Sequence, residues 1–221
     1  MTKVTHGFVS FTEVESGHHG SYNEWHLFDH MPEQFPLPGV VFGQRWALTP
    51  ELRAHRHAVD PLDRIHYFTL YLLTEPIDAT LRDFFALASE LRAKNRFHEH
   101  RTAHLAGPLE VTACVAAPAA LISAEAVPYR PNRGVHVRLS ATAADTVDAD
   151  LTGHPGVSGA WTFTGSDLSP PELRNLTMTV AWLDQDPAVV AANLPAAPAS
   201  TEFAATLASI DPFGAMDWFD G

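Results

Sequence analysis

The first half of the chain alternates strand-like runs with stretches that have helical spacing. Four runs are rich in β-branched and aromatic residues, as strands are, and they lie at 5–14, 40–49, 65–74 and 109–116. Between the last two runs, apolar residues from Leu81 to Leu91 recur every three or four positions. This periodicity predicts a helix over 78–97.

A second helix is expected after the first strand, from Ser21 to about residue 34. Ser21 fits the N-cap position, and Glu24 stands three residues later, as in a capping box. Prolines and Gly39 end this helix. The polar stretch 50–63 is expected to be an exposed loop. The resulting order, β-α-β-β-α-β, is that of a ferredoxin-like unit.

The second half repeats part of this pattern after a segment rich in Ala and Pro. The motif His154-Pro155-Gly156-Val157 echoes Leu37-Pro38-Gly39-Val40, and a Gly and then a Trp follow each motif within a few residues. Strands are expected at 134–141 and 175–183, and helical turns at 145–151 and 187–210. Only 214–219 is a candidate for the fourth strand.

The sequence therefore predicts an α+β protein in which two fused ferredoxin-like halves form a dimeric-type α/β barrel within one chain. Residues 1–118 form the half with the candidate site, 119–132 the linker, and 133–221 a degenerate second half. A four-stranded antiparallel sheet has helices on one face, so its other face must be covered. We expect the two sheets to enclose a cavity, with the helices on the purely apolar strand faces.

Composition narrows the classes of function. The net charge of −12 argues against a nucleic-acid partner, because phosphate binding needs clustered cations. The single cysteine, Cys114, excludes an internal disulfide and a thiolate zinc cage. The chain has no apolar signal core at its start and no run long enough to cross a bilayer, so a cytoplasmic protein without membrane contact is expected. Glycine-rich phosphate loops are absent, so a nucleotide cofactor is not expected.

Histidine carries the most promising chemistry. The chain has 13 histidines, and His26 and His30 are four residues apart, so they share one face of the expected helix. We expect His30 to act as acid or base, with His26 or Glu24 assisting, because an imidazole exchanges protons near neutral pH. The alternatives are a solvated helix face or a metal site, which would need a third ligand. A second cluster is expected on a polar helix end as a solvated patch, formed by His98, His100 and His104.

Strand alternation separates two kinds of face. Tyr67 and Tyr71 share the face of their strand that is opposite the purely apolar one. We expect the faces that bear hydroxyls and histidines to line the cavity, with Tyr67 or Tyr71 donating to a developing enolate. The expected substrate-binding residues are His6, Ser10, Arg45, Trp46 and His66. The alternative is a face that is buried for stability alone.

The pattern Asn23-x-Trp25-x-x-x-Asp29-His30-x-Pro32, followed by Leu37-Pro38-Gly39-Val40 and Arg45-Trp46, resembles the dimeric α/β-barrel superfamily. The closest resemblance is to EthD-like and stress-responsive barrel proteins. This chain has His26 where an aromatic residue is usual and Asp29 where Glu is usual. The resemblance implies a fold and a cavity and leaves the reaction open, since relatives include cofactor-free isomerases, polyketide cyclases, monooxygenases, haem enzymes and proteins without known activity.

These observations predict a small cavity enzyme that transfers protons without a cofactor. Its reaction would be an isomerisation, cyclisation or elimination of a carbonyl-bearing, partly aromatic or polyketide-like small molecule. Two alternatives stay open: a metal or haem enzyme whose ligands are cavity histidines such as His26 and His30, and a ligand-binding barrel without catalysis. The expected partner is a small molecule, and the chain is expected to be a monomer or a homodimer.

Overall fold

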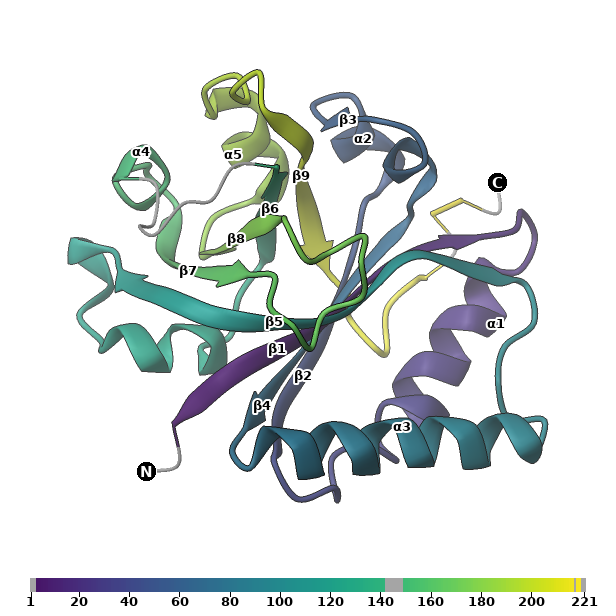
Figure 1. Ribbon diagram of the computed structural model, residues 1–221. Coiled ribbons are helices and arrows are strands. Elements are labelled where there is room, and N and C mark those ends of the chain that lie inside the picture. The colour runs from purple at the N-terminus through teal and green to yellow at the C-terminus, as the bar shows by residue number, and fades with distance from the viewer. Residues whose placement is uncertain (1–2, 142–148, 217, 220–221) are drawn as a thin grey trace.

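The computed structural model describes residues 3–141, 149–216 and 218–219 (Figure 1). Its strands are β1 (Val4–Val14), β2 (Val40–Ala47), β3 (His57–Ala58), β4 (Tyr67–Thr74), β5 (Arg101–Ala116), β6 (Gly134–Ser140), β7 (Val157–Thr164), β8 (Thr177–Leu183) and β9 (Thr201–Ser209). They form one sheet in the order β2-β4-β1-β5-β7-β8-β6-β9-β3, and β2 also pairs with β9. This last pairing closes eight antiparallel strands into a barrel.

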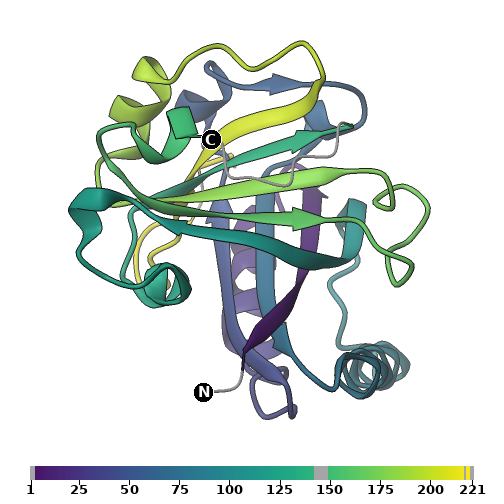
Figure 2. The ribbon, with the colours of Figure 1, turned by 60° about the vertical axis from the view of Figure 1, so that its left-hand side comes forward.

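The two halves of the barrel have the same topology. The first half has the order β2-β4-β1-β5 and the second half the order β7-β8-β6-β9, so the second, third, first and fourth strands of each half follow one another. The last strand of each half pairs with the second strand of the other, through β5–β7 and β9–β2. In Figure 2 the strands of the second half run across those of the first. The predicted fold class, two fused ferredoxin-like halves in one barrel, is confirmed.

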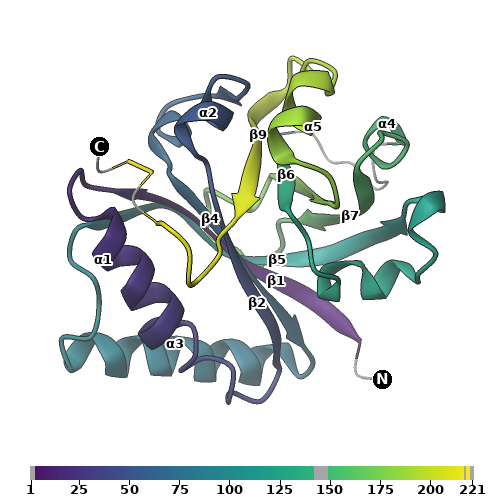
Figure 3. The ribbon, with the colours of Figure 1, turned by 180° about the vertical axis from the view of Figure 1, so that it is seen from behind.

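The helices lie outside the barrel. They are α1 (His19–Glu24), α2 (Pro50–Arg53), α3 (Ile77–Ala93), α4 (Ala149–Thr152) and α5 (Pro187–Asn193). Figures 1 and 3 show α1 and α3 beside the first-half strands, and α4 and α5 beside the second half. No helix of the described residues is long and apolar enough to cross a membrane.

The interior of the barrel is filled, which corrects the expected position of the cavity. Val9, Phe11 and Phe68 are fully buried there against side chains of the second half, and the Phe11 and Phe203 rings lie 5.4 Å apart. The purely apolar strand faces therefore pack against each other. Helix α3 instead covers the face that bears hydroxyls, where Phe84 packs against Tyr71. The reason is that the sheets of a fused barrel must cover each other with their most apolar faces.

The fourth strand of the second half is β9, so the predicted helical turns up to residue 210 are wrong beyond α5, and 214–219 is not a strand in its described part. The segment Thr201–Ser209 is rich in alanine, which favours helix. It forms a strand because Phe203, Ala205 and Leu207 alternate into the barrel core while the backbone pairs with β6. The predicted helix at 145–151 lies mostly outside the described residues.

The first helix also differs from its expected boundaries. It begins at His19, with His18 at the N-cap position, so Ser21 is inside the helix. Gly17 has a φ of +82°, a conformation that glycine adopts easily, and it lets the chain leave β1 and enter the helix early. After α1, residues Trp25–His30 form a π-helical turn in which the Met31 amide donates to the His26 carbonyl. We call residues 19–30 the first helix below.

Two further boundaries were predicted wrongly. Strand β5 starts at Arg101, eight residues earlier than expected, because its first part pairs with β1 and only its last part with β7. Gly107 and Pro108 are unusual inside a strand, so the sequence pattern did not show that β5 continues through them. The expected loop 50–63 contains α2, β3 and a 3₁₀ turn at Leu62–Arg64.

Candidate active site

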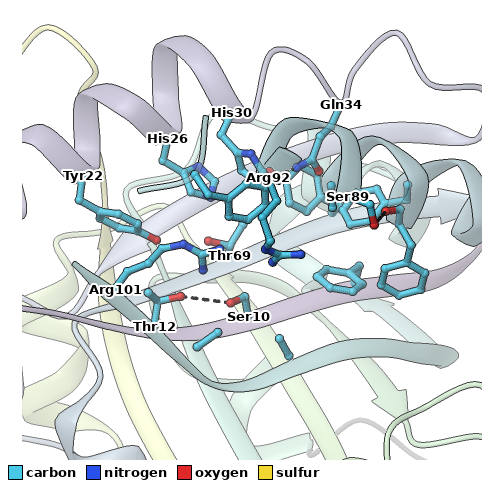
Figure 4. Close-up of a pocket in the computed structure, with 18 residues that line it drawn as sticks. Ser10, Thr12, Tyr22, His26, His30, Gln34, Thr69, Ser89, Arg92 and Arg101 are labelled. Atoms are coloured by element: carbon cyan, nitrogen blue, oxygen red, sulfur yellow. Dashed lines mark hydrogen bonds between the residues drawn. The ribbon is translucent and has the colours of Figure 1, made fainter. Parts of the chain in front are cut away.

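A cavity of about 300 Å³ lies between the first-half sheet and the helices α1 and α3 (Figure 4). Its floor is the hydroxyl-bearing face of β1 and β4, with Ser10, Thr12, Thr69 and Tyr71. Aromatic rings form much of the remaining wall, from Phe8, Phe84, Phe85 and Phe97. The volume lies at the lower end of the range for small-molecule sites, and the mixture of rings and hydroxyls suits a flat ligand with polar edges.

Four polar side chains of the first helix and the turn after it line this cavity. Tyr22, His26 and His30 follow one another at intervals of four residues, and Gln34 continues the series in the turn after the helix. Residues four apart share a helix face, which is why all four point the same way. The π-helical turn at Trp25–His30 lies within this series, and such turns are frequent at functional sites.

His30 is buried and neutral. The Gln34 side-chain amide donates to His30 Nε2 over 2.9 Å, and His30 Nδ1 has no hydrogen-bond partner in the described part of the chain. The ring stacks on Trp25, with centroids 4.6 Å apart. Burial first, and the positive charge of Arg101 second, lower the pKa of His30 to about 4. At neutral pH this imidazole is therefore uncharged.

His26 lies one turn earlier in the same environment. Its side chain is buried, and its Nδ1 also has no partner among the described residues. Burial and the charge of Arg45 hold the pKa of His26 well below its ordinary value. Both imidazoles of the predicted pair are therefore uncharged and face the cavity.

The charged groups at the cavity are cations. Arg101, from the start of β5, and Arg92, from α3, line it. The Arg101 guanidinium lies over the rings of Trp25 and Phe97, at 5.4 and 5.2 Å from their centroids. Burial lowers the pKa of Arg101, although the group stays charged at neutral pH. No described residue that lines the cavity is acidic.

Arg45 stands behind this wall, 2% exposed. Its guanidinium packs against the rings of Tyr22 and Tyr67, at 4.7 and 5.0 Å from their centroids. Its Nη2 donates to Asn23 Oδ1 over 3.0 Å, and Asn23 Nδ2 donates to the Tyr67 hydroxyl over 3.0 Å. Arg45 thus does not line the cavity. It packs against the lining residue Tyr22, and its charge lowers the pKa of His26.

The structure brings part of the predicted catalytic set together. His26, His30 and Tyr71 line the cavity, and burial raises the pKa of Tyr71, whose hydroxyl has no partner in the described part of the chain. Tyr67 lies outside the cavity, because its hydroxyl is 3.0 Å from His19 Nδ1 and accepts from Asn23. Glu24 is exposed on the far side of the first helix and does not reach the cavity.

Of the predicted substrate-binding residues, Ser10 lines the cavity, where its hydroxyl is 3.1 Å from that of Thr12. Trp46 faces the barrel core and donates to Asn132 Oδ1. His6 and His66, like Arg45 and Trp46, lie away from the cavity lining. The His66 ring packs against His19 and accepts from the Val14 amide, and His6 is buried on β1 with its Nδ1 3.1 Å from the Thr5 hydroxyl.

Tyr22, Gln34 and Arg101 are among the cavity residues that the sequence analysis missed. Tyr22 and Gln34 continue the four-residue spacing of His26 and His30, so the spacing alone signalled them. Arg101 could not be found, because its place depends on the early start of β5.

The predicted patch of His98, His100 and His104 does not form on a helix end. His104 lies in β5, with its Nε2 2.6 Å from Glu13. Among the described residues, the group that brings three metal-ligating side chains within 4.8 Å is Glu15, His18 and His100, at the surface. His26 and His30 belong to no such group.

The chain matches no protein-family model and no curated protein. Solved structures are similar. A chlorite dismutase-like protein has a TM-score of 0.52 and 13% identity, covering 95% of this chain and 96% of that one. An anthrone oxidase-like protein has a TM-score of 0.51 and 10% identity, covering 96% of this chain and 94% of that one. At these identities the likeness shows the fold alone, a dimeric-type α/β barrel, which is the fold that the sequence motif implied.

Proposed function

We propose that this protein is a cavity enzyme that catalyses proton transfer on a carbonyl-bearing, partly aromatic or polyketide-like small molecule. The product would be an isomer, a cyclised compound or an elimination product. The observation that carries the proposal is the position of His30, a neutral buried imidazole at a cavity that also holds a guanidinium and a tyrosine hydroxyl without a partner among the described residues. A base beside two oxyanion donors is the arrangement that enolisation requires.

The aromatic wall would hold the substrate. Phe84 and Phe8 have ring centroids 4.8 Å apart, and the Phe97 ring lies next to His30, with centroids 5.0 Å apart. A flat ring system between these groups gains apolar contact and keeps its polar edge toward the floor. Positioning of the acidic carbon beside the imidazole supplies part of the rate enhancement.

His30 would then accept the proton from the carbon next to the carbonyl. The C–H electrons move into the carbon–carbon bond, and the carbonyl π electrons move to oxygen to form an enolate. Arg101 and the Tyr71 hydroxyl would donate to this oxyanion. The imidazolium returns the proton to another atom of the substrate, so the enzyme is regenerated and no redox partner is needed.

Gln34 would act as the positioning residue for this base. Its side-chain amide holds His30 Nε2, and its Oε1 is buried without a partner in the described chain. If the amide turns by 180°, Oε1 accepts from Nε2–H and the lone pair of the ring is then on Nδ1. Gln34 can therefore serve either neutral tautomer of His30.

A divalent metal fits this cavity poorly. Its two imidazoles stand among Arg45, Arg92 and Arg101, and no carboxylate of the described lining offsets the guanidinium charges.

A metal or haem mechanism and a purely ligand-binding role are the competing proposals. Metal analysis and an absorption spectrum of the active protein test the metal or haem mechanism. The exchange experiment below tests whether the protein only binds its ligand. The two proteins of similar structure have enzyme names, and anthrone is an aromatic ketone. Both facts support a catalytic role for this protein.

The test is hydrogen–deuterium exchange at the carbon next to the carbonyl of α-tetralone, followed by NMR. The wild-type protein should accelerate exchange, and His30→Gln should reduce the acceleration by about a hundredfold or more. His55→Gln is the matched control, because His55 is an exposed histidine outside the cavity. Exchange that is equal in wild type and His30→Gln would contradict the proposal.

A further inference from the structure

Two arginines, Arg101 in the cavity lining and Arg45 behind it, have no counter-ion among the described residues. Arg45 is almost fully buried, and Arg101 is partly buried with a fully buried Nε. Neither forms an ion pair with a described carboxylate, although the chain has 26 Asp and Glu and a net charge of −12. A buried cation without a counter-ion is unfavourable. This charge is therefore a feature that a bound group would compensate.

The acids of the neighbouring elements are turned away from the cavity. On the first helix and the turn after it, Asp29 and Glu33 both bind Arg96 at N···O distances of 2.5 and 2.7 Å. On α3, Glu90 binds Lys94, while Ser89 and Arg92 face the cavity. The acids of both elements thus lie away from the cavity, and Arg92 is the α3 cation that lines it.

Several hydrogen-bonding groups on the cavity side also lack partners in the described chain. They belong to Arg45, Arg101, His26, His30 and Tyr71. Such groups are normally satisfied when buried. Each guanidinium packs against two aromatic rings, which restricts its orientation before any ligand binds. A planar, fixed guanidinium is suited to a planar oxyanion.

We propose that the substrate of this cavity is an anion, an aromatic molecule that carries an ionised carboxylate or phenol, with its negative charge beside Arg101. The proposal rests on the proposed function in placing the substrate in this cavity. Arg92, at the mouth, would attract the anion, and Arg45 would act through the Tyr22 ring as a positioning residue. The apolar rings of the wall hold the body of the ligand, and the guanidinium selects its charge.

Anion binding would also strengthen the base. The free cavity disfavours a proton on His30, because the imidazole is buried near Arg101 and Arg45. A negative ligand offsets these cations, so the imidazolium that forms during proton transfer becomes less unfavourable. The substrate would thus supply the charge that makes His30 an effective base.

The test is calorimetric binding of 2-naphthoate, with 2-naphthamide as its neutral counterpart and an acidic naphthol as the phenolate arm. We expect 2-naphthoate to bind more tightly than 2-naphthamide. Arg101→Leu should weaken 2-naphthoate by about thirtyfold or more and leave 2-naphthamide within about threefold. Arg101→Lys should recover part of the loss, because it keeps the charge without the planar fork. The naphthol arm shows whether the favoured oxyanion is a carboxylate or a phenolate.

Arg82→Leu is the matched control, since Arg82 is an exposed arginine of α3 whose ion pair is with Asp83. Thermal melting of each variant shows whether it is folded. Equal affinity for acid and amide, or an Arg101→Leu variant that is folded and binds 2-naphthoate as wild type does, would overturn the proposal. His30→Gln should still bind 2-naphthoate. Anion binding without any proton exchange would therefore refute the proposed function and leave this inference standing.

Discussion

The imidazole rings of His26 and His30 lie edge to face on the cavity side of the first helix, with centroids 5.2 Å apart. The positive charge that a proton would bring to His30 lowers the pKa of His26 further. The pair can therefore hold one proton but not easily two. This is a useful property for a base that must stay neutral until the substrate delivers its proton.

Tyr71→Phe should lower the exchange rate by about a hundredfold and leave the free energy of unfolding unchanged or slightly higher. The hydroxyl is buried without a partner in the described structure, so its removal relieves a cost in the folded state and takes away an oxyanion donor in the transition state. Exchange kinetics and urea denaturation measure the two effects. Tyr129→Phe, at an exposed tyrosine, is the control. A stability loss without a rate loss would assign Tyr71 to the core instead.

The rate should depend on pH through His30. For a neutral ketone, kcat/KM reports the free enzyme, and the base works only when His30 is unprotonated. We expect kcat/KM to be flat near neutral pH and to fall as the pH drops through about 4. With a bound anion the corresponding limb in kcat should lie at higher pH. Rate measurements from pH 3.5 to 8 test this, and a limb near 6.5 for the neutral ketone would contradict it.

Acid should also destabilise the fold through the same group. The pKa of His30 is about 4 in the folded protein and near its ordinary value of 6.5 in the unfolded chain. Between these values the unfolded chain binds a proton that the folded protein does not, so the free energy of unfolding falls as the pH drops from 6.5 to 4. His30 contributes on the order of 3 kcal/mol to this decrease. His66, whose pKa is lowered to about 3 by burial and Arg53, acts in the same direction.

Urea denaturation at several pH values measures this dependence. His30→Gln should make the free energy of unfolding less dependent on pH between 6.5 and 4, whereas His55→Gln should not. The same slope in wild type and His30→Gln would show that the ring is not buried as described.

The pattern of the sequence was sufficient for the strands whose two faces differ in polarity. Val9 and Phe11 alternate with Phe8 and Ser10, and this alternation specified both the strand and the separation of its faces. The same reasoning placed His26 and His30 on one helix face.

The pattern could not say which face would meet the helices. That choice depends on the second half of the chain, whose sheet covers Val9 and Phe11 and leaves Phe8 and Ser10 to α3. Strand β9 and Arg101 were missed for a related reason. Pairing with β6 overrides the helix preference of the alanines in β9, and pairing with β1 extends β5 to Arg101.

Phe8 and Phe11, three positions apart on β1, should respond in opposite ways to replacement by alanine. Phe11 is fully buried in the barrel core against Phe68 and Phe203, so Phe11→Ala should cost about 3–5 kcal/mol of stability. It should leave the affinity of the folded protein for 2-naphthoate unchanged, because Phe11 faces away from the cavity.

Phe8 is partly exposed, lines the cavity and packs against Phe84. Phe8→Ala should weaken ligand binding several-fold and reduce stability less than Phe11→Ala does. Urea denaturation and calorimetry on the two variants measure both quantities. The reverse result, with binding lost in Phe11→Ala and kept in Phe8→Ala, would place the ligand between the two sheets, where the filled core leaves it no room.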